Sequence, residues 1–191
     1  NQRRAGLLPG NPDPKWDNLS IVWLSFGVHG NEASCSETAM ITLFELASAA
    51  DDNIKKQLKN TLVILDPSLN PDGYSRYTHW YKQVANKTPD VRPESREHQE
   101  PWPRGRPNHY YFDLNRDWAW QTQVETQQRA VQYLSWMPQI HADFHEQGYS
   151  SPYYFAPAAN PYHSYVTKWQ KYFHCLWLLA EVDLSKFLTD L

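Results

Sequence analysis

The sequence has few cysteines, no long apolar run and no excess of charge of one sign. Its two cysteines, Cys35 and Cys175, do not stand in a spacing typical of metal sites, and whether they pair stays open. No run of about eighteen apolar residues occurs, so no membrane span is predicted. The 18 basic residues are balanced by 21 acidic ones, and without a basic cluster a nucleic-acid partner is excluded.

Short apolar segments alternate with helical patterns along the chain. Residues 20–26 (SIVWLSF) and the run before Pro67 (TLVILD) are typical of strands buried on both faces. Residues 139–148 (QIHADFHEQG) alternate apolar and polar side chains and predict a third strand. Helical spacing predicts helices over 33–49 and 117–136. This order favours an α/β fold with a mixed, mostly parallel sheet flanked by helices.

The remaining segments are less regular. Residues 75–112 are polar, rich in proline and aromatics, and without a sustained period, which predicts a long functional loop. A strand at 153–157, with Tyr153 and Tyr154, and a Trp- and Tyr-rich helix at 162–180 are expected near the end of the sequence. In the helix predicted over 117–136, the expected buried members are Val124, Ala130, Val131 and Leu134.

Polar clusters follow each of the three predicted strands. They are His29 to Glu32, Asn70 to Gly73, and His145 to Gln147. In open α/β sheets, functional sites gather beyond the carboxyl ends of the strands. We therefore expect these clusters to meet at one edge of the sheet, with Asn70 and Asp72 building a turn there.

Two of these clusters contain zinc-binding residue types. His29 and Glu32 stand three residues apart at a strand-to-helix turn, and His145 ends another strand. Two imidazoles and one carboxylate are a common zinc set in hydrolases, where a fourth position is left for water. Each residue alone is a weak signal, because a His-x-x-Glu turn is usually a surface pair. His141 lies about 13 Å from His145 along a strand and is assigned a structural role.

Four motifs, HGNE, LNPDGY, DLNRDW and DFHEQ, occur in the order and rough spacing of the zinc carboxypeptidases of the M14 family. Over about residues 20–160 the chain resembles a bacterial branch of that family. The resemblance implies a three-layer sandwich and one zinc ion bound by His29, Glu32 and His145. Asp143 is expected to support a ligand from behind.

The same resemblance implies residues that bind substrate. Asn115 and Arg116, in DLNRDW, match the pair that holds the terminal carboxylate of a peptide, a task for which a guanidinium fork is suited. Arg106 is our choice for the arginine that stabilises the oxyanion of the scissile carbonyl, and Arg76 is its rival.

The implied function is that of a zinc metallocarboxypeptidase, which hydrolyses the last bond of a peptide with a free terminal carboxylate. Two alternatives stay open: a non-catalytic, zinc-dependent module that binds carboxylates or peptides, and an amidohydrolase acting on acyl-amino acids. A peptidase of this family is expected to be exported, to the periplasm or outside the cell. We expect residues 1–191 to form a single zinc-peptidase-like domain.

One residue of the family's mechanism has no match in the sequence. The resemblance implies a glutamate on a late strand as general base, but after His145 only Glu146 and Glu181 occur. Alternation points Glu146 away from the metal, and Glu181 falls in a predicted helix. We therefore expect a fragment, truncated at both ends and lacking the C-terminal catalytic segment, with little or no activity of its own.

Overall fold

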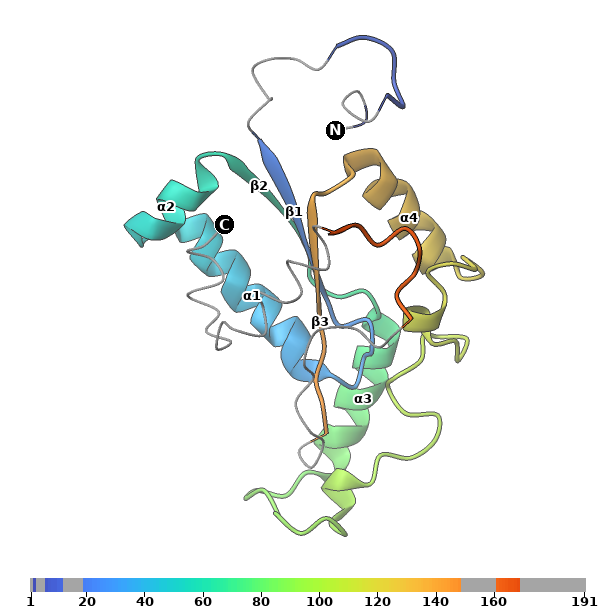
Figure 1. Ribbon diagram of the computed structural model, residues 1–191. Coiled ribbons are helices and arrows are strands. Elements are labelled where there is room, and N and C mark those ends of the chain that lie inside the picture. The colour runs from blue at the N-terminus through green and yellow to red at the C-terminus, as the bar shows by residue number, and fades with distance from the viewer. Residues whose placement is uncertain (1, 3–5, 12–18, 149–160, 169–191) are drawn as a thin grey trace.

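A computed structural model describes residues 2, 6–11, 19–148 and 161–168 of the chain (Figure 1). Strands and helices alternate through the described part, and two short 3-10 segments interrupt its longest loop. The elements are β1 (Ser20–Phe26), α1 (Ala33–Ser48), α2 (Asp52–Leu58), β2 (Thr61–Asp66), α3 (Pro71–Val84), η2 (Arg96–His98), η3 (Leu114–Arg116), α4 (Val124–Trp136) and β3 (Ile140–Phe144).

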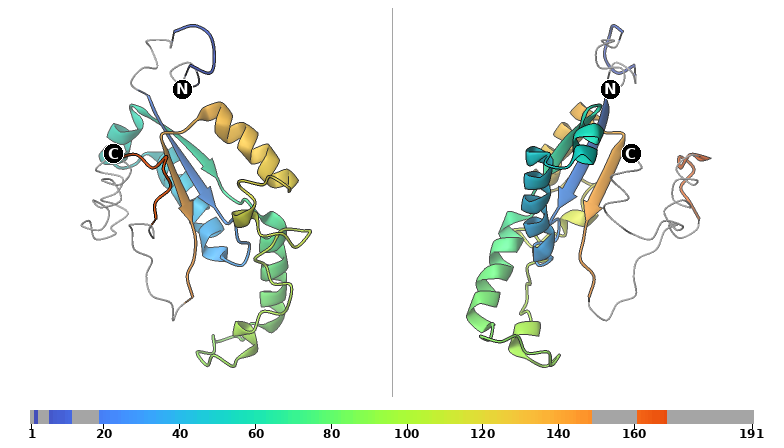
Figure 2. Two further views of the ribbon diagram at one scale, coloured as in Figure 1. Left: turned by 45° about the vertical axis from the view of Figure 1, so that its right-hand side comes forward. Right: turned by 90° about the vertical axis from the view of Figure 1, so that its left-hand side faces the viewer.

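The three described strands form a parallel sheet in the order β2-β1-β3, and their arrows point the same way in Figure 2. Ser20 pairs with Thr61 on one side of β1, and Phe26 pairs with Phe144 on the other. The predicted α/β class and the three predicted strands are confirmed. Because the strands are parallel, the three polar clusters lie beyond the same edge of the sheet, as expected.

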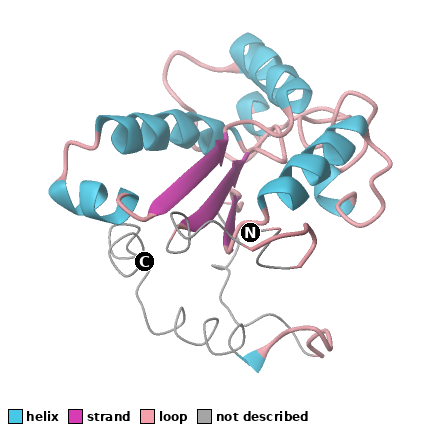
Figure 3. Ribbon diagram, turned by 90° about the horizontal axis from the view of Figure 1, so that it is seen from above, coloured by secondary structure: helices cyan, strands magenta, loops and turns pink. Residues whose placement is uncertain are grey.

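Helices cover both faces of the sheet, which makes three layers (Figure 3). On one face, Val22, Leu24 and Phe26 pack with Cys35 and Ala39 of α1. Alternation along β1 sends its other side chains to the α4 face, because successive strand residues point to opposite faces.

On the α4 face, the core is aromatic and polar. The rings of Trp23 and Tyr133 lie 5.5 Å apart, and His141 Nε2 lies 2.8 Å from Ser25 Oγ. Burial lowers the pKa of His141, so the imidazole packs there as a neutral group. The structural role predicted for His141 is therefore confirmed.

Helix α4 differs from its prediction in start and in orientation. It begins at Val124 and not at Asp117, since the Asp117 carboxylate accepts hydrogen bonds from the backbone N–H groups of Thr122 and Gln123 and closes a turn before the helix. Of the four side chains predicted to be buried, only Ala130 is. The other three, Val124, Val131 and Leu134, are 55%, 66% and 62% exposed.

The loop predicted from residue 75 is wrong in its first part, where α3 runs. Pro71 occupies the first turn, where its missing N–H costs nothing, and Asn70 caps the helix by accepting a hydrogen bond from the N–H of Gly73. The stretch Asn-Pro-Asp-Gly, which reads as a turn, is thus a helix start. Residues 85–112 do form a long loop, in which η2 is the one helical segment.

Several predictions fall outside the described residues. The strand expected at 153–157 and the glutamate at 181 lie there, as does Cys175, while Cys35 is buried and forms no disulfide within the described residues. Of the helix expected over 162–180, only residues 162–168 are described, and 162–167 are not helical. Within the described residues, no helix has the length and apolar character needed to cross a membrane.

Candidate metal centre

The turn between β1 and α1 packs tightly against the start of α3. A Cβ added to Gly30 would overlap the backbone nitrogen of Tyr74 and the carbonyl carbon of Gly73. The side chain of Asn70 holds the same turn, because its Nδ2 donates to the carbonyl oxygen of Val28 at 3.4 Å. Only glycine fits this contact, which explains why a glycine follows the first candidate ligand.

The three predicted ligands converge at the carboxyl edge of the sheet. Because Phe26 and Phe144 are register partners, His29 and His145 emerge from adjacent strands a short distance beyond them. Glu32 lies between the two imidazoles: its Oε1 is 2.7 Å from Nδ1 of His29, and its Oε2 is 3.0 Å from Nδ1 of His145. One ligand atom from each of the three residues lies within 4.8 Å of the others.

This set of donors fits zinc. Two imidazole nitrogens and a carboxylate oxygen are zinc's usual ligands in hydrolytic sites, and they leave one coordination position for water or substrate. Both imidazoles present the same nitrogen, Nδ1, toward the shared carboxylate of Glu32. The His29 side chain is 3% exposed, and that of Glu32 is 14% exposed. The centre is therefore shielded on one side and accessible through His145, which is 30% exposed.

Within the centre, the pKa of Glu32 is lowered and that of His145 is raised. Burial would raise the pKa of Glu32, but hydrogen bonds from His145, His29 and the backbone N–H of Glu146 outweigh it and lower this pKa to about 2. Hydrogen bonds to Asp143 and then to Glu32 raise the pKa of His145 to about 9. At neutral pH the metal-free centre therefore holds an ionised Glu32 beside a protonated His145.

Zinc binding at pH 7.5 is therefore expected to release close to one proton from His145. Its pKa of about 9 lies above the pH of the experiment, and zinc requires the unprotonated nitrogen. Zinc affinity should accordingly rise with pH up to about pH 9 and then level off. Calorimetry in two buffers of different ionisation enthalpy measures the released proton. His79→Gln, at an exposed histidine, is the control and should leave the release unchanged; a binding enthalpy independent of buffer would contradict the expectation.

Each imidazole has a carboxylate close to its Nε2 atom. Asp143 Oδ2 lies 3.1 Å from Nε2 of His145, which is the supporting contact predicted from the sequence. Asp113 Oδ1 lies 3.3 Å from Nε2 of His29, and this residue was missed. The sequence does contain a signal for Asp113, because this residue begins the DLNRDW motif. A carboxylate that is hydrogen-bonded to an imidazole, as Asp143 is to that of His145, fixes the orientation of a metal-binding ring.

Arg106, the predicted oxyanion arginine, lies beside the centre. Its Nε and Nη2 bind Oδ2 of Asp113 at 3.0 and 2.9 Å, and its Nη1 lies 3.3 Å from Nδ1 of His29. Burial would raise the pKa of Asp113, but its hydrogen bonds with Arg106 lower it. The guanidinium is thus oriented by a carboxylate that also contacts a candidate ligand.

Arg76, the rival of Arg106, has a different environment. Its Nη1 donates to the carbonyl oxygens of Arg104 and Pro107 at 2.9 and 3.2 Å, and its Nη2 donates to that of Asn108 at 3.0 Å. These bonds stabilise the loop that carries Arg106. Arg76 therefore supports the loop through its backbone, while Arg106 contacts the centre.

The predicted substrate pair, Asn115 and Arg116, lies in η3, which begins directly after Asp113. The Oδ1 atom of Asp113 accepts a hydrogen bond from the backbone N–H of Asn115 at 2.9 Å and so caps this segment. Arg116 is exposed, and its Nη1 donates to the carbonyl oxygen of Asn115 at 3.3 Å. Asp113 thus links the pair to the metal centre.

A second residue missed by the sequence reasoning is Glu100. Its Oε2 accepts a hydrogen bond from Nδ2 of Asn31 at 2.9 Å, and its Oε1 accepts one from the N–H of Gly105. Asn31 lies between two candidate ligands, and Gly105 precedes Arg106. The carboxylate of Glu100 therefore joins the turn between β1 and α1, which carries His29 and Glu32, to the loop that carries Arg106.

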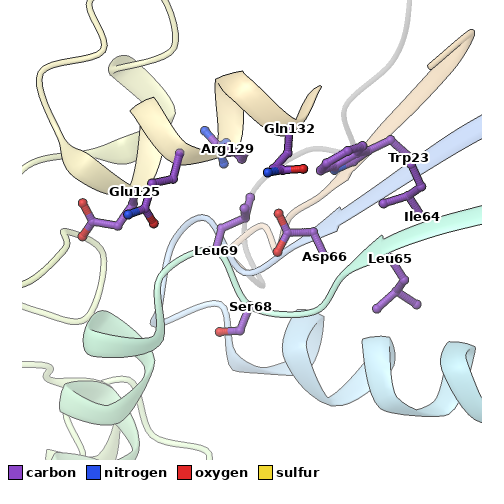
Figure 4. A pocket seen from close by; sticks show the side chains of 10 residues that line it. Trp23, Ile64, Leu65, Asp66, Ser68, Leu69, Glu125, Arg129 and Gln132 are labelled. Atoms are coloured by element: carbon purple, nitrogen blue, oxygen red, sulfur yellow. The ribbon is translucent and has the colours of Figure 1, made fainter. Parts of the chain in front are cut away.

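A separate cavity of about 390 Å³ lies between α4 and β2 (Figure 4). Its lining includes Asp66 and Arg129 but none of the three candidate ligands. The Arg129 guanidinium lies 3.7 Å above the Trp118 ring, and burial raises the pKa of Asp66. We assign this cavity no part in the metal centre.

Comparison with known protein families gives one match. The family model described as zinc carboxypeptidase matches residues 10–137 of the chain. This span includes His29 and Glu32, and it ends before His145. No curated protein matches the chain.

Proposed function

The chain belongs to the zinc carboxypeptidase family, whose model matches more than half of its length, and from this we propose that it binds one zinc ion through His29, Glu32 and His145. The observation that carries the proposal is the convergence of three donor atoms within 4.8 Å, two from the turn between β1 and α1 and one from the residue that follows β3. We further propose hydrolysis of the last bond of a peptide with a free terminal carboxylate.

When bound, zinc supplies the chemistry that such hydrolysis needs: it polarises the scissile carbonyl and activates water. The residues of this chain bind the substrate and orient it. Nη1 of Arg106 is the donor assigned to the developing oxyanion, because Asp113 holds the rest of that guanidinium in a fixed orientation. Arg116 and Asn115 are assigned to the terminal carboxylate, which a guanidinium can bind through two parallel hydrogen bonds.

A second candidate function is favoured by one contact. Glu146 adjoins a candidate ligand, but its Oε1 accepts hydrogen bonds from the backbone N–H and the hydroxyl of Ser34. Because this carboxylate is bound to the start of α1, it is not assigned as general base. Without an assigned base, the described residues support binding as well as they support turnover. We therefore keep a zinc-dependent module that binds terminal carboxylates as the alternative.

Zinc content and hydrolysis together test the proposal. The chain is purified, and its zinc content is quantified. Three kinds of substrate are then offered: peptides with a free terminal carboxylate, the same peptides with an amidated C-terminus, and acyl-amino acids. Stoichiometric zinc with cleavage of the free form alone supports a carboxypeptidase. Zinc-dependent binding of the free form without cleavage supports the module, and cleavage of the amidated or acyl substrates supports the amidohydrolase. A protein that takes up no zinc removes the basis of all three.

An exported location, in the periplasm or outside the cell, is part of the proposal. It rests on the family alone. Fractionation of cells that produce the natural protein would test it, and recovery in the cytoplasm only would contradict it.

A further inference from the structure

Glu146 directly follows the third candidate ligand and binds the first turn of α1. Its Oε1 accepts hydrogen bonds from the backbone N–H of Ser34 at 2.6 Å and from the Ser34 hydroxyl at 2.5 Å. In return, the backbone N–H of Glu146 donates to Oε2 of Glu32 at 3.0 Å. Residues 112 or more positions apart are thus joined by reciprocal hydrogen bonds.

The start of α1 needs this outside partner. The first N–H groups of a helix have no acceptor within the helix, and Glu32, the N-cap residue of α1, makes no side-chain capping bond. Its carboxylate is turned to the two imidazoles instead. Glu146 supplies the missing acceptor, and a negative charge at a helix N-terminus is favourable.

We propose that Glu146 is a positioning residue that fixes the start of α1 against the end of β3 and thereby orients the Glu32 carboxylate between His29 and His145. The inference deepens the proposed function and rests on its metal site. It assigns to Glu146 a role that depends on an acceptor oxygen at the end of the side chain. A general base, by contrast, would depend on the ability to take up a proton.

This difference separates Glu146→Gln from Glu146→Ala. The amide oxygen of glutamine still accepts hydrogen bonds, so Glu146→Gln should keep zinc affinity within a few-fold of the parent chain. Glu146→Ala removes the acceptor and should lower zinc affinity by about 10- to 100-fold, as the loss of an outer-shell partner typically does. Ser34→Ala removes the hydroxyl alone, so its zinc affinity should lie between those of Glu146→Gln and Glu146→Ala. Glu94→Ala, at an exposed glutamate, is the matched control and should change nothing.

Two measurements on the full chain decide the inference. Competition with a chromophoric chelator gives zinc affinity, and hydrogen exchange followed by NMR in the metal-free chain reports on the backbone amide of Ser34. In Glu146→Ala that amide should exchange at least about tenfold faster than in the parent. Equal zinc affinity in Glu146→Ala and the parent, unchanged exchange at Ser34, or a loss in Glu146→Gln as large as in Glu146→Ala would each overturn the inference.

The exchange experiment also separates this inference from the function on which it rests. If the parent chain binds no zinc, the metal site fails, and faster exchange at Ser34 in Glu146→Ala still upholds the contact between β3 and α1. If the parent binds zinc and Glu146→Ala binds it equally well, the metal site stands and the positioning role fails.

Discussion

Replacing Glu32 by glutamine is expected to lower zinc affinity by at least about a hundredfold, since loss of an outer-shell partner alone typically costs 10- to 100-fold. Glu32 lies within hydrogen-bond distance of both other candidate ligands, at 2.7 Å from His29 and 3.0 Å from His145. Its pKa of about 2 keeps it ionised at any pH used for the measurement. Glu32→Gln removes that negative charge and leaves a neutral amide oxygen, which is a poor zinc ligand.

The measurement is chelator competition at pH 7.5 on the parent chain and the variant. Glu45→Gln is the matched control, because it makes the same change at an exposed position of α1, the helix that begins directly after Glu32, and it should leave zinc affinity unaltered. Thermal unfolding of the metal-free proteins shows whether both variants remain folded. If folded Glu32→Gln binds zinc as tightly as the parent, the cluster of His29, Glu32 and His145 is not the metal site.

The candidate ligands could be predicted because each follows a strand with a strong local pattern. The apolar run of β1 and the alternation of β3 are visible within five to seven residues. Once both strands are assigned to one parallel sheet, His29 and His145 must lie at the same edge. Spacing along the chain then gives Glu32, at the turn into α1.

The start of α3 could not be predicted as easily, because its signals also describe a turn. An asparagine cap followed by proline and glycine is the composition of a turn as well as of a helix start. The later residues of α3 are mainly aromatic and polar, and Gly73 is the one buried member of the helix. The helix is held by that close backbone contact and not by an apolar stripe.

Helix α4 shows a different limit of sequence patterns. Periodicity predicts which side chains share a face of a helix, but the face that meets the sheet depends on the neighbours. The sheet side of α4 carries Thr126, Arg129 and Ala130, opposite a strand face that carries Ser25 and His141. A polar strand face receives a polar helix face, and so Val131 and Leu134 are exposed.

The contacts of three carboxylates could not be predicted for a third reason, the distance along the chain between each carboxylate and its partner. Asp113 contacts His29, Glu100 contacts Asn31, and Glu146 contacts Ser34. Each contact joins residues far apart in the sequence, and a carboxylate in a loop or after a strand has no periodic pattern to mark it. Only the fold brings these side chains to the turn between β1 and α1.

Gly30→Ala is expected to have the largest effect on stability. The added methyl would overlap the backbone of Gly73 and Tyr74, which belong to the first turn of α3 and cannot move aside by a change of rotamer. Overpacking typically costs about 1–3 kcal/mol and more where backbone must shift, so we expect the free energy of unfolding to fall by about 3 kcal/mol or more. Since Gly30 adjoins His29, zinc affinity should fall in the same variant.

Urea unfolding and chelator competition measure the two losses, with Gly10→Ala as control. Among the described residues, a methyl at Gly10 meets nothing within 4 Å, and its positive φ of 91° implies backbone strain of about 1–2 kcal/mol. Gly30→Ala should therefore unfold at clearly lower urea than Gly10→Ala, and it alone should lose zinc affinity. Equal unfolding midpoints with unchanged zinc binding would mean that the turn between β1 and α1 does not depend on its contact with α3. The convergence of the three candidate ligands would then need another cause.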